Sequence, residues 1–162
     1  MSIADEFVQA NAAYAAAFAK GDLPMPPGRH VAVVACMDAR LDPAKALGLE
    51  EGDAHVIRNA GGRAADAIRS LVISQQLLGT REVVVVHHTD CGMLTFTDEQ
   101  LRQKVKDELG VDSDTPYLAF SNLEQSVRDD VQAIRTSPQL LKDVPVRGFI
   151  YDVKTGRISE VK

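Results

Sequence analysis

The sequence has no tryptophan, only two cysteines and no excess of positive charge. Two cysteines in 162 residues are too few for a disulfide framework. We therefore expect free or metal-bound thiols in a reducing compartment, the cytoplasm. The net charge of −5 disfavours nucleic acid and anionic membranes as partners, because both are themselves negatively charged. These shortages exclude a disulfide-stapled secreted module and a basic nucleic-acid-binding domain.

The N-terminal segment lacks both a long hydrophobic run and a basic leader. Its apolar stretch, residues 11–19, is short, and Asp5 and Glu6 stand where a secretory signal would carry basic residues. Three aromatic residues recur instead near one helical face: Phe7, Tyr14 and Phe18. We expect an ordinary helix that stops at Gly21, followed by a stiff connector over residues 23–28, which contain three prolines.

Internal repeats, low-complexity tracts and interdomain linkers are also absent, so we expect residues 1–162 to form one domain. Within it, apolar runs typical of buried strands alternate with helical patterns. Strands are predicted at residues 31–35, 54–58, 82–87 and 146–153, with a short edge strand at 158–161. Helices are predicted after the N-cap Asp42, over residues 64–78, and after capping boxes that begin at Thr97 and Ser121. This alternation predicts an α/β fold with a mostly parallel sheet flanked by helices.

Chemically active side chains follow the first predicted strand. The apolar run at residues 31–35 stops at Cys36, and Asp38 and Arg40 come directly after it. In open α/β sheets, ligands bind at the carboxyl ends of strands. A thiol, a carboxylate and a guanidinium at this position therefore indicate a functional site.

A second strand, residues 82–87, runs into His88 and Cys91. If the two strands are neighbours, Cys36, His88 and Cys91 converge. Two thiolates and one imidazole are good zinc ligands, and three protein ligands with an open fourth position are typical of catalytic zinc. His87 competes with His88 for the role of ligand. Because successive strand residues face opposite sides, the spacing to Cys91 selects His88, and His87 is expected to be packed or hydrogen-bonded.

Three sequence blocks resemble the signatures of the β-class carbonic anhydrases: CMDAR at 36–40, RNAG at 58–61 and HTDCG at 88–92. The resemblance extends from about Val31 to the last strand, and the stretch HHTDCGMLTFTDEQ is similar to a compact, actinobacterial-like branch. It implies one Zn²⁺ per subunit, bound by Cys36, His88 and Cys91. It also implies a homodimer or homotetramer, in which residues 1–28 form an arm that packs on a partner subunit.

The resemblance further implies a mechanism for reversible hydration of carbon dioxide. Zinc-bound hydroxide attacks the substrate, Asp38 orients the hydroxide, and Arg40 keeps Asp38 ionised and in place. In some members the matching carboxylate leaves the arginine and becomes a fourth zinc ligand, which closes the site. The sequence departs from the family pattern at two positions. Val33 occupies the position of a tryptophan that some members use in an inhibitory bicarbonate site, and Ala39 replaces a frequent serine.

Three other functions compete with hydration of carbon dioxide. Relatives with the same ligands hydrolyse carbonyl sulfide or carbon disulfide, and an apolar pocket discriminates weakly between such small linear substrates. A metal-free thiol oxidoreductase is a second alternative, although the chain has no C-x-x-C motif. A third is a binding module, for instance for nucleotides, although neither G-x-G-x-x-G nor a G-K-[ST] loop is present.

Overall fold

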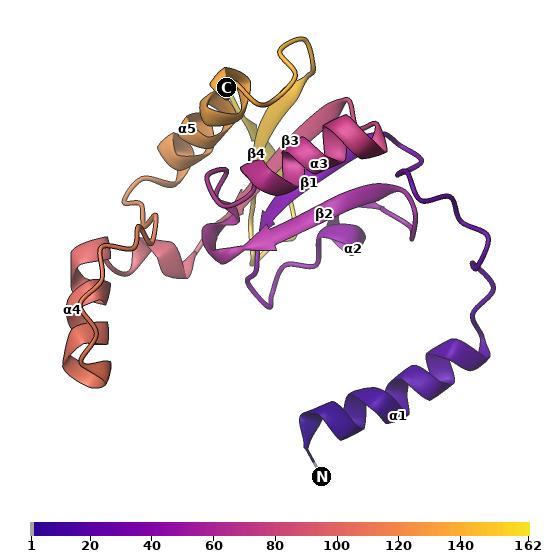
Figure 1. The fold of residues 1–162 in the computed structure, drawn as a ribbon, viewed down its shortest axis with the longest axis horizontal. Coiled ribbons are helices and arrows are strands. Elements are labelled where there is room, and N and C mark those ends of the chain that lie inside the picture. Colours follow the sequence, from indigo (N-terminus) through magenta and orange to yellow (C-terminus); the bar gives the residue numbers. More distant parts are fainter. Residues whose placement is uncertain (1) are drawn as a thin grey trace.

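The computed structural model describes residues 2–162, whose centre is a single five-stranded sheet with the order β2-β1-β3-β4-β5 (Figure 1). The first four strands in this order are parallel, and β5 pairs antiparallel with β4. The strands are β1 (Val31–Cys36), β2 (Ala54–Asn59), β3 (Glu82–His88), β4 (Val146–Tyr151) and β5 (Ile158–Val161). The predicted α/β class is confirmed.

Five α-helices and two 3₁₀ turns accompany the sheet in residues 2–162: α1 (Ile3–Ala16), α2 (Pro43–Leu47), η1 (Ala60–Gly62), α3 (Ile68–Leu78), η2 (Gly92–Leu94), α4 (Asp98–Leu109) and α5 (Leu123–Thr136). Alternate residues of β1 pack into two apolar clusters. Ala32 and Val34 pack with side chains of α3 and α5, whereas Val33 and Ala35 pack with residues of α2 and η2. The sheet is therefore covered on both faces, which explains why its central strands are apolar throughout.

Local sequence signals account for most element ends. Asp42 caps α2, its side chain accepting a hydrogen bond from the Lys45 amide, and Gly48 ends this helix in the left-handed conformation. Thr97 and Gln100 form the predicted capping box of α4. The predicted edge strand also forms, pairing with β4 through residues 158–161.

Several predicted boundaries were wrong. The first helix ends at Ala16 and does not reach Gly21. Residues 64–67 form turns, so α3 begins four residues later than expected, at Ile68. The cap of α5 is Asn122 and not Ser121, and β4 stops at Tyr151, two residues early. Capping residues and hydrophobic periodicity predict that an element exists, but they fix its ends only to within a few residues. Neighbouring residues can serve equally well as caps, and tertiary contacts select one of them.

Two helices stand away from the sheet. Figure 1 shows α1 at the end of the extended connector, away from the sheet, and α4 projecting on the other side. A hydrogen bond from the Tyr14 hydroxyl to Glu51, at 3.3 Å, links α1 to the loop before β2. No residue of α1 is buried. None of the helices in residues 2–162 is long and apolar enough to span a membrane.

Candidate metal centre

The ends of β1 and β3 bring the three predicted ligands together. These strands are parallel neighbours, with Ala35 beside Val86, so Cys36 and His88 emerge at the same edge of the sheet. A tight turn after β3, with Asp90 at φ 54°, returns Cys91 to this edge. The ligand atoms of Cys36, His88 and Cys91 all lie within 4.8 Å of one another, and all three residues are buried. Their spatial convergence, inferred from the sequence, is therefore present in the structure.

His88 is oriented to offer a lone pair to a metal. Its Nδ1 lies 2.7 Å from the carbonyl oxygen of Thr89. A carbonyl only accepts, so Nδ1 carries the ring proton and Nε2 is left with a lone pair. Nε2 is buried and has no hydrogen-bond partner within residues 2–162. A buried nitrogen without a partner is costly in a protein interior, and coordination of a metal ion would satisfy it.

The pKa values of the two cysteine thiols are shifted in opposite directions. The hydrogen bond from Cys91 lowers the pKa of Cys36 to about 4. The same contact, together with burial, raises the pKa of Cys91. Opposite shifts of this kind favour one thiolate and one thiol in the pair, and a divalent cation would displace the remaining proton. This donor set fits Zn²⁺ in a three-ligand site.

Asp38 and Arg40 form a forked pair beside the ligands. Arg40 donates from Nε to Oδ1 of Asp38 at 3.0 Å and from Nη2 to Oδ2 at 2.8 Å. These hydrogen bonds hold the pKa of Asp38 well below its usual range. Oδ2 of Asp38 also lies 3.7 Å from Nε2 of His88. The carboxylate is therefore ionised, held by Arg40 and directed toward the metal-facing nitrogen.

Asp90 is a second partner of Arg40 that the sequence did not indicate. Its carboxylate accepts from Arg40 Nη1 at 2.8 Å, and its backbone carbonyl oxygen accepts from Nη2 at 2.9 Å. The turn that carries Cys91 thus also fixes Arg40. The only sequence signal for this contact is the position of Asp90 between two predicted ligands.

Contacts with the backbone hold the end of β1, where Cys36 lies. The Arg58 side chain donates to the carbonyl oxygens of Cys36, Asp38 and Leu41, and so orders the backbone after β1. Gly62 has φ 64°, and a Cβ added to it would lie 2.8 Å from the Cys36 nitrogen. Any side chain at this position would therefore displace the backbone of Cys36, a predicted metal ligand.

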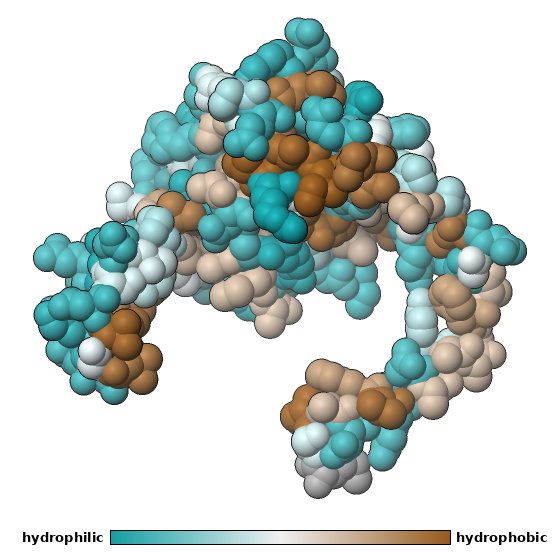
Figure 2. All heavy atoms as spheres, in the orientation of Figure 1, coloured by the Kyte–Doolittle hydropathy of each residue, from teal (hydrophilic) through white to brown (hydrophobic). Residues whose placement is uncertain are grey.

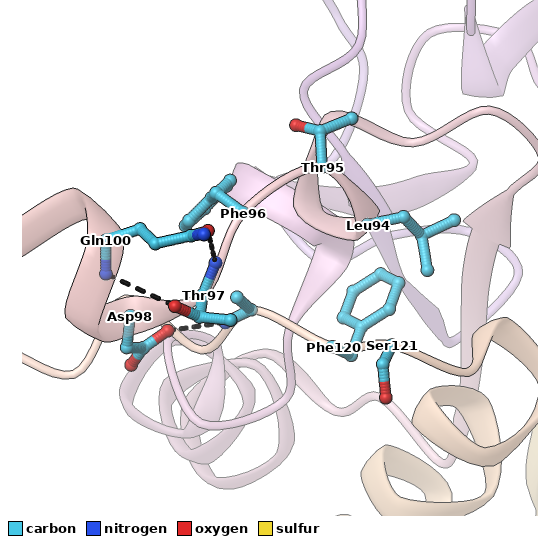
Figure 3. Close-up of a pocket in the computed structure, with 9 residues that line it drawn as sticks. Leu94, Thr95, Phe96, Thr97, Asp98, Gln100, Phe120 and Ser121 are labelled. Atoms are coloured by element: carbon cyan, nitrogen blue, oxygen red, sulfur yellow. Dashed lines mark hydrogen bonds between the residues drawn. The ribbon is translucent and has the colours of Figure 1, made fainter.

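A cavity of about 460 Å³ opens next to the site, between the segment after η2 and the start of α5. Its lining includes apolar side chains such as Leu94 and Phe120 and polar ones such as Thr97, the N-cap residue of α4 (Figure 3). None of the five predicted site residues lines it. Two of its lining residues, Phe96 and Phe120, pack against the apolar cluster that contains Cys36 and Cys91.

A model of the carbonic anhydrase family matches residues 31–111. β-Carbonic anhydrase 1 of Mycobacterium tuberculosis is 49% identical over 162 residues, covering 99% of each chain. This chain belongs to the β-carbonic anhydrase family. The carbonic anhydrase of Streptococcus mutans has a structure with a TM-score of 0.95 and 51% identity, covering 100% of this chain and 99% of that one. A carbon disulfide hydrolase of Acidithiobacillus thiooxidans is 34% identical, covering 83% of this chain and 78% of its own.

Proposed function

We propose that this chain catalyses the reversible hydration of carbon dioxide to bicarbonate and a proton, using one Zn²⁺ held by Cys36, His88 and Cys91. One observation carries the proposal: two thiol groups and an oriented imidazole meet beside an ionised carboxylate that a guanidinium holds in a fork. Family membership supports the same reaction.

The zinc ion, when bound, supplies a Lewis acid that makes water nucleophilic near neutral pH. Asp38, being ionised, accepts a hydrogen bond from the attacking water and orients its lone pair toward carbon dioxide. Arg40 keeps this carboxylate ionised and fixed, since both of its fork contacts are short. The apolar side chains around Cys36 and Cys91 suit a small, uncharged substrate.

Carbonyl sulfide or carbon disulfide is the alternative substrate class. The relationship to a carbon disulfide hydrolase, at 34% identity, favours testing it. All three substrates are small, linear and uncharged, and the same zinc ligands and Asp38–Arg40 pair would serve each of them.

Parallel assays on one zinc-loaded sample decide between these substrates. We expect stopped-flow measurements with a pH indicator to show rapid hydration of carbon dioxide, and sulfide release from carbonyl sulfide and carbon disulfide to be much slower. Faster turnover of either sulfur substrate would reject the assignment. Zinc analysis and thiol titration on the same sample test the metal-free oxidoreductase, which would be active without zinc and would cycle both thiols.

The proposed assembly rests on the N-terminal arm, and the proposed cytoplasmic location rests on the free cysteines. The exposed helix α1 and its connector make up the described part, residues 2–28, of the arm predicted over residues 1–28. This arm would pack on a second subunit, as in a homodimer or a pair of such dimers. Both cysteines are free thiols, which is consistent with the cytoplasm because that compartment keeps thiols reduced.

A further inference from the structure

A buried polar network lies directly behind the metal ligands, on the opposite face of the sheet. His87 precedes the ligand His88, and its ring points toward α5 because successive strand residues alternate. Its Nδ1 lies 2.8 Å from the Ser126 hydroxyl, and its Nε2 lies 3.1 Å from Oδ2 of Asp130. Arg63 donates to the other carboxylate oxygen of Asp130 at 3.0 Å. None of these residues is part of the proposed reaction.

Asp130 is the centre of this network. Only 4% of its side chain is exposed, and it accepts from both His87 and Arg63. An isolated buried carboxylate would be strongly unfavourable, and the hydrogen bonds from these two partners compensate for its burial. Apolar residues of similar size often stabilise a protein as well as a buried ion pair does. The network is therefore better explained by the geometry that it imposes than by the stability that it adds.

The network reaches the metal ligands through Gly62. Nε2 of His87 lies 3.2 Å from the Gly62 carbonyl oxygen, so this N–H is shared between Gly62 and Asp130. The Gly62 Cα is wedged against the ends of β1 and β3: a Cβ there would lie 2.8 Å from the Cys36 nitrogen and 3.2 Å from the Val86 oxygen. A shift of His87 would therefore move both strand ends that carry ligands.

Aromatic packing adds a fourth segment to the same unit. Phe120 stacks on His87 with ring centroids 5.5 Å apart, and the Arg63 guanidinium lies 5.1 Å from the centroid of Phe120. Arg63 also donates to the carbonyl oxygen of Leu118. The end of β3, the turn η1, the helix α5 and the loop before it are thus joined at one point.

We propose that Asp130 is a positioning residue for the metal centre, acting through His87 and Gly62 to hold Cys36 and His88 at the spacing that zinc requires. The inference rests on the proposed zinc site. It makes α5, which supplies no ligand, part of the machinery that retains the metal.

The test compares zinc retention in four holo proteins: wild type, Asp130→Asn, Asp129→Asn and Ile134→Val. Asp130→Asn keeps the side-chain size but removes the charge. Asp129→Asn makes the same change one residue away on α5, at an exposed carboxylate that contacts Gln125. Ile134→Val removes one methyl group from the buried core beside α5 and leaves the network unchanged. It is the control for a loss of protein stability alone.

We expect Asp130→Asn to release zinc to an excess of a chromogenic chelator about tenfold faster than wild type, the effect typical of losing a residue that orients metal ligands. Asp129→Asn and Ile134→Val should release zinc at the wild-type rate. The visible absorption of the Co²⁺-substituted protein should also change in Asp130→Asn alone, because it reports the ligand geometry. Should Asp130→Asn not fold, Ser126→Ala removes the hydroxyl from His87 and should show a smaller change in the same direction.

Equal zinc release from wild type and Asp130→Asn overturns the inference while leaving the proposed function intact. So does a rate in Ile134→Val that rises as far as in Asp130→Asn, because retention would then simply follow thermal stability. A wild-type protein that retains no zinc overturns the proposed function and this inference together.

Discussion

At the scale of single residues, the metal centre separates two roles for its charged groups. The thiols and the imidazole offer ligand atoms within 4.8 Å of one another. Asp38 stays outside this set, held by Arg40 and directed toward His88. Because the fork lowers the pKa of Asp38, this carboxylate remains an acceptor across the whole neutral range. In the proposed mechanism, binding of the metal and orientation of the nucleophile therefore depend on different residues.

Asp38→Asn separates these two roles. The amide keeps the shape of the carboxylate but loses its charge and one acceptor oxygen, so it cannot orient the attacking water in the same way. We expect a loss of carbon dioxide hydration of at least about 100-fold, in the range for removing a positioned proton acceptor, with one zinc still bound per chain. Stopped-flow rates and elemental analysis on the same sample measure both quantities. Retained activity in zinc-loaded Asp38→Asn would contradict the role proposed for this residue.

The grouping of the candidate site residues could be predicted from the sequence, whereas two contacts that support them could not. Cys36, Asp38 and Arg40 lie within five consecutive residues, and His88 and Cys91 are three positions apart, so local pattern and strand topology sufficed to group them. The contacts of Asp90 with Arg40 and of Asp130 with His87 join residues 50 and 43 positions apart. No short motif encodes such contacts, because they depend on how α5 and the turn before Cys91 pack against the sheet.

At the scale of elements, the strands were easier to predict than the helix starts. The apolar run of β1 is buried on both faces, and its pairing on both sides leaves little freedom in its boundaries. The start of α3 is different. Ala64 and Ala67 are good helix formers and are buried, but they lie in the turns that follow Gly62. The position of Gly62 against Cys36 fixes the chain direction there, and this tertiary constraint overrides helix propensity.

One contact at this scale orders the segment that leads into α5. The first residue of α4, Asp98, accepts hydrogen bonds from the backbone amides of Tyr117, Leu118 and Ala119. Leu118 has φ 63°, an uncommon conformation for a residue other than glycine. The carboxylate thus holds a loop that would otherwise relax, and this loop carries Phe120 onto His87.

Asp98→Asn should loosen this loop. An amide presents one acceptor oxygen where the carboxylate presents two, so we expect hydrogen exchange at residues 117–119 to accelerate about tenfold, consistent with losing about 1.5 kcal/mol of charge-assisted hydrogen bonding. Glu99→Gln, the same change at the next position, is the control and should leave exchange unchanged. Exchange measured by mass spectrometry or NMR reports both variants, and identical protection in wild type and Asp98→Asn would show that the loop is held by other contacts.

The pH dependence of this contact has a definite sign. The amide of Ala119 in particular, with those of Tyr117 and Leu118, lowers the pKa of Asp98 below its ordinary value of 3.8. The unfolded chain therefore binds a proton more readily than the folded one. The stabilising contribution is complete above about pH 5 and is lost as the pH falls through the lowered pKa. In wild type, protection of residues 117–119 should decline over that acidic window, whereas in Asp98→Asn this part of the decline should be absent.

At the scale of the whole molecule, apolar side chains are exposed along α1 and on the body of the chain. Ile3, Phe7 and Tyr14 are exposed along α1, although they lie on one helical face. Figure 2 shows a second apolar area on the body, over α3 and β2, where Val56, Ile73 and Leu77 are exposed. Exposed clusters of this kind mark interaction surfaces in soluble proteins. A short helix with no buried residue is also marginal by itself in water, so packing on a second subunit would explain how α1 persists.

Phe7→Asp tests this proposed arm. Phe7 is 68% exposed in the single chain, so a charge there should cost little if α1 remains in solvent and much if a partner covers it. We expect the dimer dissociation constant to rise by at least about 30-fold, the effect of losing roughly 2 kcal/mol at an interface anchor. Ala12→Asp adds the same charge on the opposite face of α1 and should leave the dimer intact. Light scattering coupled to gel filtration, over a dilution series, measures both. A Phe7→Asp protein that dimerises as wild type does would place α1 outside the subunit interface.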